Sequence, residues 1–318
     1  MASYASAHHS SLKSLCVSAI TPACELTVVV GSKDSEHTIG SCLAALHEAC
    51  DGLDAEIVVA DASLDSTRAI VRSRFPRVAL VLCPPDALVP ALWDAGLQRA
   101  RGRHVAFTTA ECAVERSWAR SLLAGVRRGA AGAGGFFALD RDASAVTRAT
   151  FYLRYSAYLP GAAGPRAEIA ADNACYRREI LEQFHDRHAG GFWEVETHRK
   201  LRAAGEHLVM VPGAVAHLVW ASAFNRLAAA RFAHGRRFGA WRVRVIGRAA
   251  WKIVAGAPLV PFLIALRSAR RALPRREHTW SFLTAMPVLL VLASCWAAGE
   301  AVGAASTTEG DRLKEVAA

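Results

Sequence analysis

Short apolar runs rich in β-branched residues alternate with helical patterns in the first third of this chain. The runs lie at residues 26–30 (LTVVV), 56–60 (EIVVA), 78–83 (VALVLC) and 104–110 (HVAFTTA). After the first run, Ile39, Leu43 and Leu46 are spaced as on one face of a helix. Strands that alternate with helices in this way form a parallel sheet with both faces covered. The sequence therefore predicts an α/β fold with a Rossmann-like, mostly parallel sheet.

The middle of the chain predicts further strands and helices. We expect a strand at 136–139, helices at 145–159, 173–184 and 191–205, and a strand, a turn and a second strand across 207–220. The glycines in 129–135 (GAAGAGG) predict a loop that leads into the first of these strands. We expect one α/β domain over residues 25–222.

Beyond residue 225, arginine-rich sequence is followed by two apolar runs. Most of the net charge of +10 comes from this part of the chain. The first apolar run, 249–266, contains one lysine and two prolines, and basic residues flank it on both sides. The positive-inside bias places both flanks in the cytosol, so we expect a re-entrant or interfacial hairpin. The second run, 282–299, is uncharged and just long enough for a bilayer span.

The arginine-rich segment leaves two kinds of partner open. Arginines interleaved with Phe232, Phe238 and Trp241 suit anionic lipid headgroups, and the same residues also suit nucleic acid. The apolar runs that follow favour lipid. We therefore expect an anionic membrane surface as a partner and no nucleic acid.

The N-terminal segment lacks the apolar core of a signal peptide and has few basic residues. The eight cysteines form no Cys-x-x-Cys pair, which is typical of reduced thiols in the cytosol. We therefore expect a cell-membrane protein whose α/β domain is cytoplasmic. The predicted segments are a disordered leader (1–24), the α/β domain (25–222), a basic interfacial helix (223–248), membrane-associated or transmembrane helices (249–303) and a solvated tail (304–318).

Polar residues follow the first two predicted strands, where the loops of a parallel sheet commonly bind nucleotides. Ser32 and Asp34 follow the first strand, and Asp61 and Asp65 follow the second. A carboxylate such as that of Asp61 can accept hydrogen bonds from a base or a ribose. Helix capping is the alternative for these residues, above all for Asp65, which directly precedes a predicted helix.

Five segments, in this order, resemble the family 2 glycosyltransferases, which have the GT-A fold of nucleotide-diphospho-sugar transferases. They are LTVVVGSKDSEHTIGSCLAAL (26–46), AEIVVADASLDST (55–67), ALWDAGLQRARGRHVAFTTAEC (91–112), NACYRR (173–178) and GFWEVETHRKLRAAG (191–205). In addition, CWAAGEAVG (295–303) is similar to the ending of a subset of bacterial membrane-bound members. The resemblance implies a GT-A domain with C-terminal membrane-associated helices and a nucleotide-sugar donor bound at Ser32, Asp34, Asp61 and Asp65.

The family's metal-binding Asp-x-Asp motif corresponds here to Thr108-Thr109-Ala110-Glu111-Cys112. Only Glu111 could ligate a hard divalent cation there. A Mg²⁺ or Mn²⁺ ion bound through donor phosphates needs only one or two carboxylates, so we expect such a metal at a weakened site. His217 stands where similar enzymes often have a histidine near metal or pyrophosphate, although a structural role is the alternative.

Glu194 aligns with the family's general base when counted back from Leu201-Arg-Ala-Ala-Gly205. Inverting transfer needs a carboxylate that takes the proton of the acceptor hydroxyl. The preceding Gly190-Gly191-Phe192-Trp193 predicts a mobile substrate loop, and a surface ion pair between Glu194 and His198 is the alternative to catalysis. The acceptor and phosphate side is expected at Asn173, Arg177, Arg178, Trp193 and Glu196.

The leading prediction is an inverting glycosyltransferase. It would transfer a hexosyl or related sugar from a nucleotide-diphosphate donor to a lipid-linked or polysaccharide acceptor at the cytosolic membrane face. The alternative, motivated by the degenerate metal motif, is a catalytically impaired member of the fold that serves as a membrane scaffold or partner subunit. A nucleotidyltransferase is less favoured, because no glycine-rich phosphate loop with a following lysine is present.

Overall fold

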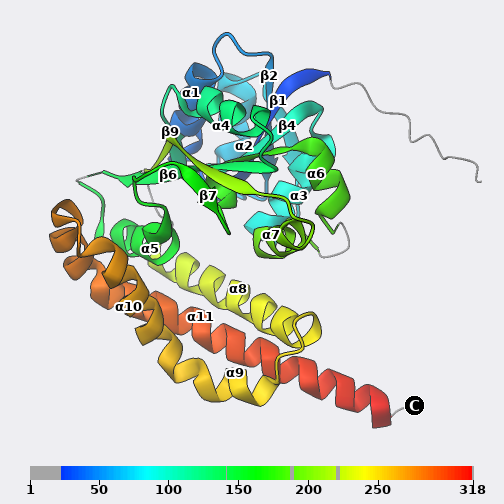
Figure 1. Ribbon diagram of the computed structural model, residues 1–318, viewed down its shortest axis with the longest axis vertical. Helices are drawn as coiled ribbons and strands as arrows, with labels where there is room; N and C mark the ends of the chain where they lie inside the picture. The colour runs from blue at the N-terminus through cyan, green and yellow to red at the C-terminus, as the bar shows by residue number, and fades with distance from the viewer. Residues whose placement is uncertain (1–22, 141, 187–189, 220–222, 317–318) are drawn as a thin grey trace, which may run out of the picture.

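The computed structural model of the chain describes residues 23–140, 142–186, 190–219 and 223–316 (Figure 1). The predicted leader therefore lies almost entirely outside the described residues. The strands are β1 (Cys24–Ser32), β2 (Ala55–Asp61), β3 (Ala79–Leu82), β4 (Gly102–Thr109), β5 (Cys112–Val114), β6 (Gly132–Leu139), β7 (Gly164–Arg166), β8 (Ala174–Arg177) and β9 (Leu208–Leu218). The helices that cover them are α1 (Ile39–Ala49), α2 (Thr67–Arg74), α3 (Val89–Arg99), α4 (Trp118–Arg127), α5 (Ala145–Tyr155), α6 (Arg178–Phe184) and α7 (Glu194–Ala203).

The described strands form one mixed sheet in the order β3-β2-β1-β4-β8-β6-β9-β5, with β7 paired to β9. The pairs β1–β2, β2–β3 and β1–β4 are parallel, as the alternating pattern predicts. Ser32 pairs in register with Asp61, and Gly31 pairs with Thr109. The carboxyl ends of three neighbouring strands therefore meet at one edge, and the α/β fold with a GT-A type sheet is confirmed.

Both faces of the sheet are buried, which explains why the central strands are apolar without alternation. On one face, Val28 and Val30 pack in a core with residues of α1 and α4. On the other face, Val29 and Phe107 pack with residues of α3, α6 and α7. This second layer positions α7, and with it Glu194, beside the sheet.

Two predictions for the middle of the chain are wrong. The segment 173–184 does not form one helix, because its first part is strand β8, which pairs antiparallel with both β4 and β6 and leads into α6. Residues 208–218 form the single strand β9 where two were expected. Its pairing with β6 shifts register between Met210 and Val215, across Pro212, as expected for a bulge at a residue without an N–H group.

Four helices lie against one side of the sheet domain, below α5 in Figure 1. They are α8 (Phe224–Arg244), α9 (Ala250–Gly256), α10 (Val260–Ala272) and α11 (Arg276–Val316), with a short 3-10 turn (Ala257–Leu259) between α9 and α10. The chain bends at this turn, where Pro258 and Pro261 interrupt helical hydrogen bonding. Helix α11 continues through most of the residues predicted as a tail.

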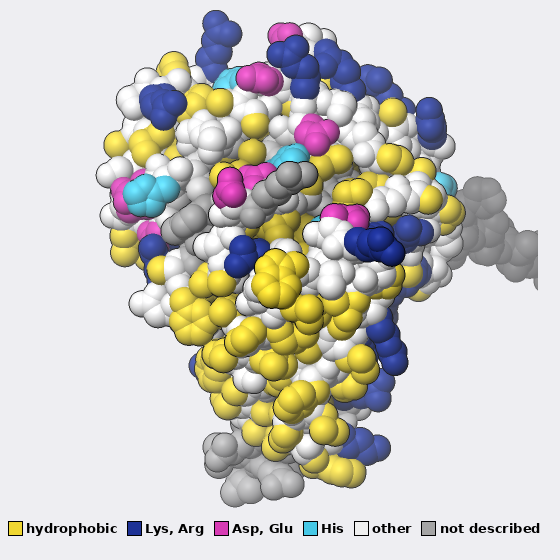
Figure 2. Space-filling view, turned by 90° about the vertical axis from the view of Figure 1, so that its left-hand side faces the viewer, with side chains coloured by type: hydrophobic (Ala, Val, Ile, Leu, Met, Phe, Trp, Pro, Cys, Tyr) yellow, Lys and Arg dark blue, Asp and Glu magenta, His cyan; other side chains and the backbone are white. Residues whose placement is uncertain are grey.

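Most of the exposed large hydrophobic side chains among the described residues lie on or beside the C-terminal helices. Two segments, Ala250–Ala272 and Arg276–Thr307, are long and apolar enough to cross a membrane by length and composition alone. Only 22% and 39% of their most apolar windows are buried against the rest of the protein. Trp251 and Trp280 are 68% and 77% exposed. Figure 2 shows hydrophobic side chains gathered over the lower half of one face.

Candidate active site

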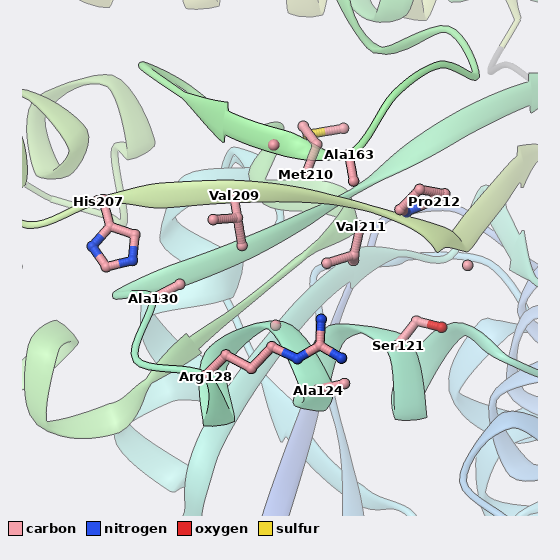
Figure 3. Close-up of a pocket in the computed structure, with 13 residues that line it drawn as sticks. Ser121, Ala124, Arg128, Ala130, Ala163, His207, Val209, Met210, Val211 and Pro212 are labelled. Atoms are coloured by element: carbon pink, nitrogen blue, oxygen red, sulfur yellow. The ribbon is translucent and has the colours of Figure 1, made fainter.

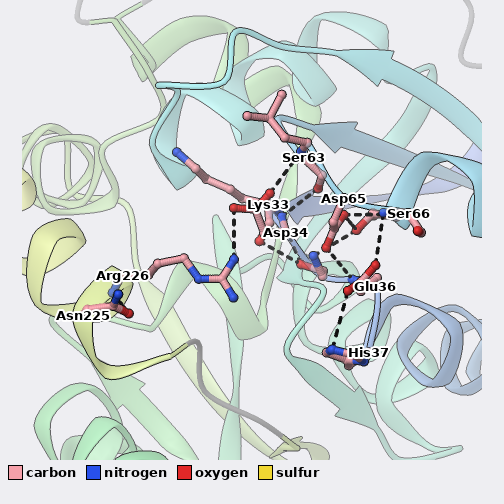
Figure 4. Close-up of polar contacts among 12 residues, drawn as sticks. Lys33, Asp34, Glu36, His37, Ser63, Asp65, Ser66, Asn225 and Arg226 are labelled. Carbon is pink, nitrogen blue, oxygen red and sulfur yellow. Dashed lines mark hydrogen bonds and ion pairs between the residues drawn. The ribbon is translucent and has the colours of Figure 1, made fainter.

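The loops after β1 and β2 form a hydrogen-bonded pair at the carboxyl edge of the sheet (Figure 4). Asp34 has a left-handed backbone with φ of 49°. Its N–H donates to Ser63 Oγ at 2.7 Å, and its Oδ1 accepts from the N–H of Leu64 at 3.0 Å. Asp34 is partly exposed, and its Oδ2 lies 3.3 Å from Arg226 Nη1. Asp34 therefore lies where the sequence predicts a nucleotide.

Asp61 lies deeper at the same edge and is fully buried. Its carboxylate accepts hydrogen bonds from the N–H and Oγ of Ser63 at 3.1 and 2.6 Å, and from Arg68 Nε at 2.8 Å. These contacts show that Asp61 organises the turn after β2. Ser32, at the end of β1, is also buried, and its Oγ has no hydrogen-bond partner among the described residues.

Asp65 lies just before helix α2, whose N-cap position is Ser66, and its carboxylate binds backbone N–H groups of both loops. Its Oδ1 accepts from the N–H of Thr67 at 3.0 Å, and its Oδ2 accepts from the N–H of Glu36 at 3.1 Å. Burial acts to raise the pKa of Asp65, but the hydrogen bonds from Thr67 and Glu36 outweigh it and hold the pKa below its ordinary value. The carboxylate therefore stays ionised and ties the two loops together.

The position of the metal motif holds one accessible carboxylate. Thr109 is 4% exposed, and its hydroxyl lies 3.5 Å from Cys112 Sγ, so it is in the core. Glu111 lies in the turn between β4 and β5 and is partly exposed. His217 on β9 lies between two other carboxylates, with Nε2 3.2 Å from Glu115 and Nδ1 3.4 Å from Asp140. No group of three or more His, Cys, Asp or Glu side chains that could hold a metal ion is found among the described residues.

Glu194 begins helix α7, and the residues before it fix its position. The N–H of Phe192 donates to Pro90 O at 2.7 Å, and the buried Phe192 ring stacks on Phe107 at 4.7 Å. Gly191 has φ of 149°, and an added Cβ would lie 2.7 Å from the backbone of Pro90. The segment expected to be a mobile loop is therefore anchored to the core at Phe192.

Burial raises the pKa of the Glu194 carboxyl to about 7, and the nearby Asp172 carboxylate adds to this effect. A carboxyl group with a pKa near neutrality is suited to take up a proton during a reaction and release it afterwards. The first residue of a helix also carries unsatisfied backbone N–H groups close to its carboxylate. Glu194 is therefore a candidate general base, and Asp172, which is not among the expected site residues, contributes to its raised pKa.

Arg154 on α5 lies next to this carboxylate pair. Its Nη2 is 2.6 Å from Asp172 Oδ2, and the Tyr155 hydroxyl donates to the same oxygen. Burial alone would lower the pKa of Arg154, but Tyr155, Asp172 and Glu111 outweigh it and raise the pKa, so the guanidinium stays charged. Arg154 is thus electrostatically coupled to both the metal-motif position and the candidate base.

Helix α8 adds a second cation. Burial and the charge of Arg154 lower the pKa of Arg231 to about 10, which leaves it charged at neutral pH. Its Nε is buried without a hydrogen-bond partner among the described residues. One turn later, His234 packs on Trp193, with ring centroids 5.9 Å apart. Burial lowers the pKa of His234 to about 3, so this imidazole is neutral.

This arrangement has polar loops at the carboxyl edge of the sheet, a Glu194 carboxyl with its pKa raised to about 7, and the charged Arg154, which is coupled to Glu194 and to Arg231. Residues 27–184 match the family model of glycosyl transferase family 2. The chain belongs to this family. No match was found among curated proteins. The match agrees with the GT-A type sheet and supports glycosyl transfer as the general activity.

Several predicted acceptor-side residues of this glycosyltransferase lie elsewhere. Arg177 pairs in register with His104 at the start of β4, because β8 runs antiparallel to β4. Arg177 and Arg178 therefore lie at the opposite end of the sheet from the loops after β1 and β2, and they pair with Glu206 and Glu182, respectively. The local sequence could not reveal this reversal of direction.

Asn173 and Glu196 have structural partners in the glycosyltransferase domain. Asn173 is fully buried, where its amide donates to Phe136 O at 2.8 Å and accepts from Trp118 Nε1 at 2.7 Å. Glu196 accepts two hydrogen bonds from Arg199, at 2.9 and 2.7 Å. Of the predicted acceptor-side residues, Trp193 alone packs beside Glu194 on a residue of α8.

A separate groove lies between α4 and β9 (Figure 3). It has a volume of about 360 Å³ and is lined by apolar residues such as Val209 and Val211, with Arg128 and His207 among its polar side chains. None of the predicted site residues of the glycosyltransferase lines it. The candidate active site is therefore defined by the sheet edge, α7, α5 and α8.

Proposed function

We propose that this chain is an inverting glycosyltransferase that uses a nucleotide-diphosphate sugar and a lipid-linked or polysaccharide acceptor. The observation that carries the proposal is the partly buried Glu194 at the first position of α7, where burial and the nearby Asp172 carboxylate raise its pKa to about 7. In this proposal the Glu194 carboxylate removes the proton of the acceptor hydroxyl as the hydroxyl oxygen attacks the anomeric carbon. The bond from that carbon to the donor diphosphate breaks on the opposite face.

The departing diphosphate gains negative charge, and cations in the site offset it. Arg231 is the best candidate, because its buried Nε has no partner among the described residues. Arg154 is held by Asp172 and adds a fixed positive charge nearby. Asp34 and Ser32 would form the nucleotide side of the donor site, and Asp61 and Asp65 would hold its two loops in place.

A divalent metal is proposed only as a partner of the donor. Mg²⁺ and Mn²⁺ are commonly bound by one or two carboxylates together with substrate phosphates. Glu111 can supply one such ligand, whereas Thr109 cannot replace the missing carboxylate and His217 faces Glu115 and Asp140. The metal would help to neutralise the diphosphate when it is bound.

A membrane location is proposed from the C-terminal helices. Exposed apolar side chains on α9, α10 and α11 suit contact with acyl chains, and Trp251 and Trp280 suit the headgroup region. Five exposed or partly exposed arginines at the end of α10 and start of α11 would meet anionic headgroups: Arg267, Arg270, Arg271, Arg275 and Arg276. In this proposal the catalytic domain lies on the cytoplasmic side, where nucleotide sugars are available.

The test of the donor site is calorimetric titration with UDP-, GDP- and TDP-sugars, each with and without Mn²⁺. We expect one nucleotide class to bind with a micromolar Kd, to bind more tightly with Mn²⁺, and to lose that gain in Glu111→Gln. Glu115→Gln is the matched control, since Glu115 pairs with His217. If no donor binds under either condition, the proposed function is wrong.

The alternative is a catalytically impaired membrane scaffold or partner subunit. It is favoured by Thr109, a core residue at the position of a metal-binding carboxylate. A scaffold predicts no sugar transfer, even from a donor that binds. It also predicts that Glu194→Gln has no catalytic effect, whereas the enzyme loses transfer and retains donor binding.

A further inference from the structure

The first turn of α8 reaches the donor loops from the C-terminal part of the chain. Arg226 Nη1 lies 3.3 Å from Asp34 Oδ2, across 192 positions of sequence (Figure 4). The charge of Arg226 also contributes to lowering the pKa of Asp65. A residue on the helix that leads into the membrane-associated segment is therefore in contact with the loop pair assigned to the nucleotide.

A chain of short contacts continues from Arg226 into the sheet edge. Asp34 donates its N–H to Ser63 Oγ at 2.7 Å, and Ser63 Oγ donates to Asp61 Oδ1 at 2.6 Å. Asp61 accepts in turn from Arg68 Nε at 2.8 Å. Asp34 has a left-handed backbone, which an Asp adopts at a small energetic cost, so its side-chain contacts help to fix this conformation. A shift of Arg226 would be transmitted first to Asp34 and then to Ser63.

Helix α8 is seated on α11 by direct backbone contact. A Cβ added at Gly303 would overlap the carbonyl oxygen of Arg236, and one added at Gly235 would overlap that of Trp296. In addition, Arg242 on α8 forms an ion pair with Glu300, which is 1% exposed. The position of Arg226 therefore depends on how α8 is seated on α11.

We propose that Arg226 is a positioning residue that couples the seating of α8 on α11 to the order of the donor loops. The inference rests on the proposed function only in treating these loops as the donor site. Because coupling free energies are reciprocal, donor binding would in turn stabilise the seating of α8. A membrane that holds α11 in place would then favour the ordered form of the loops, in which Arg226 contacts Asp34.

The size of the effect follows from the exposure of the pair. The Arg226 side chain is 51% exposed and that of Asp34 is 23% exposed. Exposed ion pairs change equilibria by about 1.5- to 5-fold. We therefore expect Arg226 to change the opening of the loops and the donor Kd within this range, without changing the chemical step.

Hydrogen exchange of the full chain in detergent tests the coupling without a donor or an acceptor. The amides to follow are those of Asp34, Glu36 and Leu64, which donate within the loop pair. Gly303→Ala should loosen α8 and raise exchange at these amides. Gly256→Ala is the matched control, because an added Cβ there meets no atom within 4 Å.

Arg226→Gln should raise the same exchange rates by about 1.5- to 5-fold, and Arg226→Lys should restore most of the protection. If the effect of Gly303→Ala passes through Arg226, adding Gly303→Ala to the Arg226→Gln variant should raise the loop exchange rates little further. Arg237→Gln, on the exposed side of α8, should leave loop exchange unchanged. Circular dichroism of each variant checks that the domain remains folded.

Two results would overturn the inference. One is faster exchange in α8 of Gly303→Ala with unchanged exchange at Asp34 and Leu64. The other is a Gly303→Ala effect that is the same with and without Arg226→Gln. Since neither readout requires catalysis, failure of the coupling is distinguishable from failure of the proposed function. For a chain that binds UDP or GDP, a Kd raised by Arg226→Gln with kcat unchanged gives a second readout.

Discussion

Arg154 Nη2 and Asp172 Oδ2 form an ion pair 2.6 Å long beside the candidate base Glu194. Asp172 is 3% exposed, so its negative charge is poorly screened and raises the pKa of Glu194 in addition to the effect of burial. The pair thus tunes the base while it holds a cation in the site.

Removing the Asp172 charge should shift the pH dependence of activity. In Asp172→Asn the pKa of Glu194 falls, because a negative neighbour is lost and Arg154 is left to attract the Glu194 carboxylate. The acidic limb of the pH–rate profile should therefore move to lower pH.

For the same variant, Asp172→Asn, we also expect a loss of about 3 kcal/mol in the free energy of unfolding by urea, since one partner of a largely buried ion pair is lost. Asp51→Asn is a surface control, and an unchanged acidic limb in Asp172→Asn would contradict the assignment.

The wild-type protein should lose activity as the pH falls through about 7, because protonated Glu194 cannot accept a proton.

The raised pKa of Glu194 should also make the stability of the protein depend on pH. A carboxyl whose pKa is higher in the folded than in the unfolded state destabilises the fold as the pH rises between the two values. Glu194→Gln should therefore stabilise the protein by about 1 to 3 kcal/mol at pH 8 and by little at pH 4. Equal Tm shifts at both pH values would argue against a raised pKa.

Arg231 should act on the chemical step. Arg231→Gln keeps the side chain polar and removes the charge, and we expect kcat to fall by about 100-fold, with a smaller change in donor Kd. Arg237→Gln controls for a general loss of positive charge on α8. A normal kcat in Arg231→Gln would exclude Arg231 from stabilising the leaving group.

The basic cluster at the end of α10 should strengthen membrane binding. Each arginine near an anionic surface contributes about 1 kcal/mol, so Arg270→Gln with Arg271→Gln should weaken binding to vesicles containing phosphatidylglycerol by about 10- to 30-fold. Co-sedimentation measures this binding, and the difference between variants should shrink in high salt. Equal binding of wild type and variant at low salt would rule out the cluster as a headgroup contact.

Much of the fold could be predicted from periodicity and residue type. The strands around Val28, Val58 and Phe107 were expected because buried parallel strands read as continuous apolar runs. The antiparallel strand at Tyr176 was missed, because its few residues carry no pattern that separates a strand from the start of a helix. Its direction decides that Arg177 lies away from the donor edge.

The site was harder to predict, because its members come from distant parts of the chain. Glu194 and Asp34 are marked by their positions in motifs, whereas Asp172, Arg154 and Arg231 act through burial and proximity that only the packing reveals. His198 illustrates the same limit. Its ring is fully buried, its Nε2 lies 2.9 Å from the Tyr176 hydroxyl, and burial lowers its pKa to about 3, which argues against the surface ion pair with Glu194 that was the alternative to catalysis.

The central claim is that Glu194 is the base of a glycosyl transfer. The most direct measurement is the incorporation of labelled sugar into a bacterial total lipid extract, from the donor that binds most tightly, by wild type and Glu194→Gln. We predict that the variant transfers sugar at least about 100-fold more slowly while its donor Kd changes less than about twofold. Undiminished incorporation by Glu194→Gln would contradict the account.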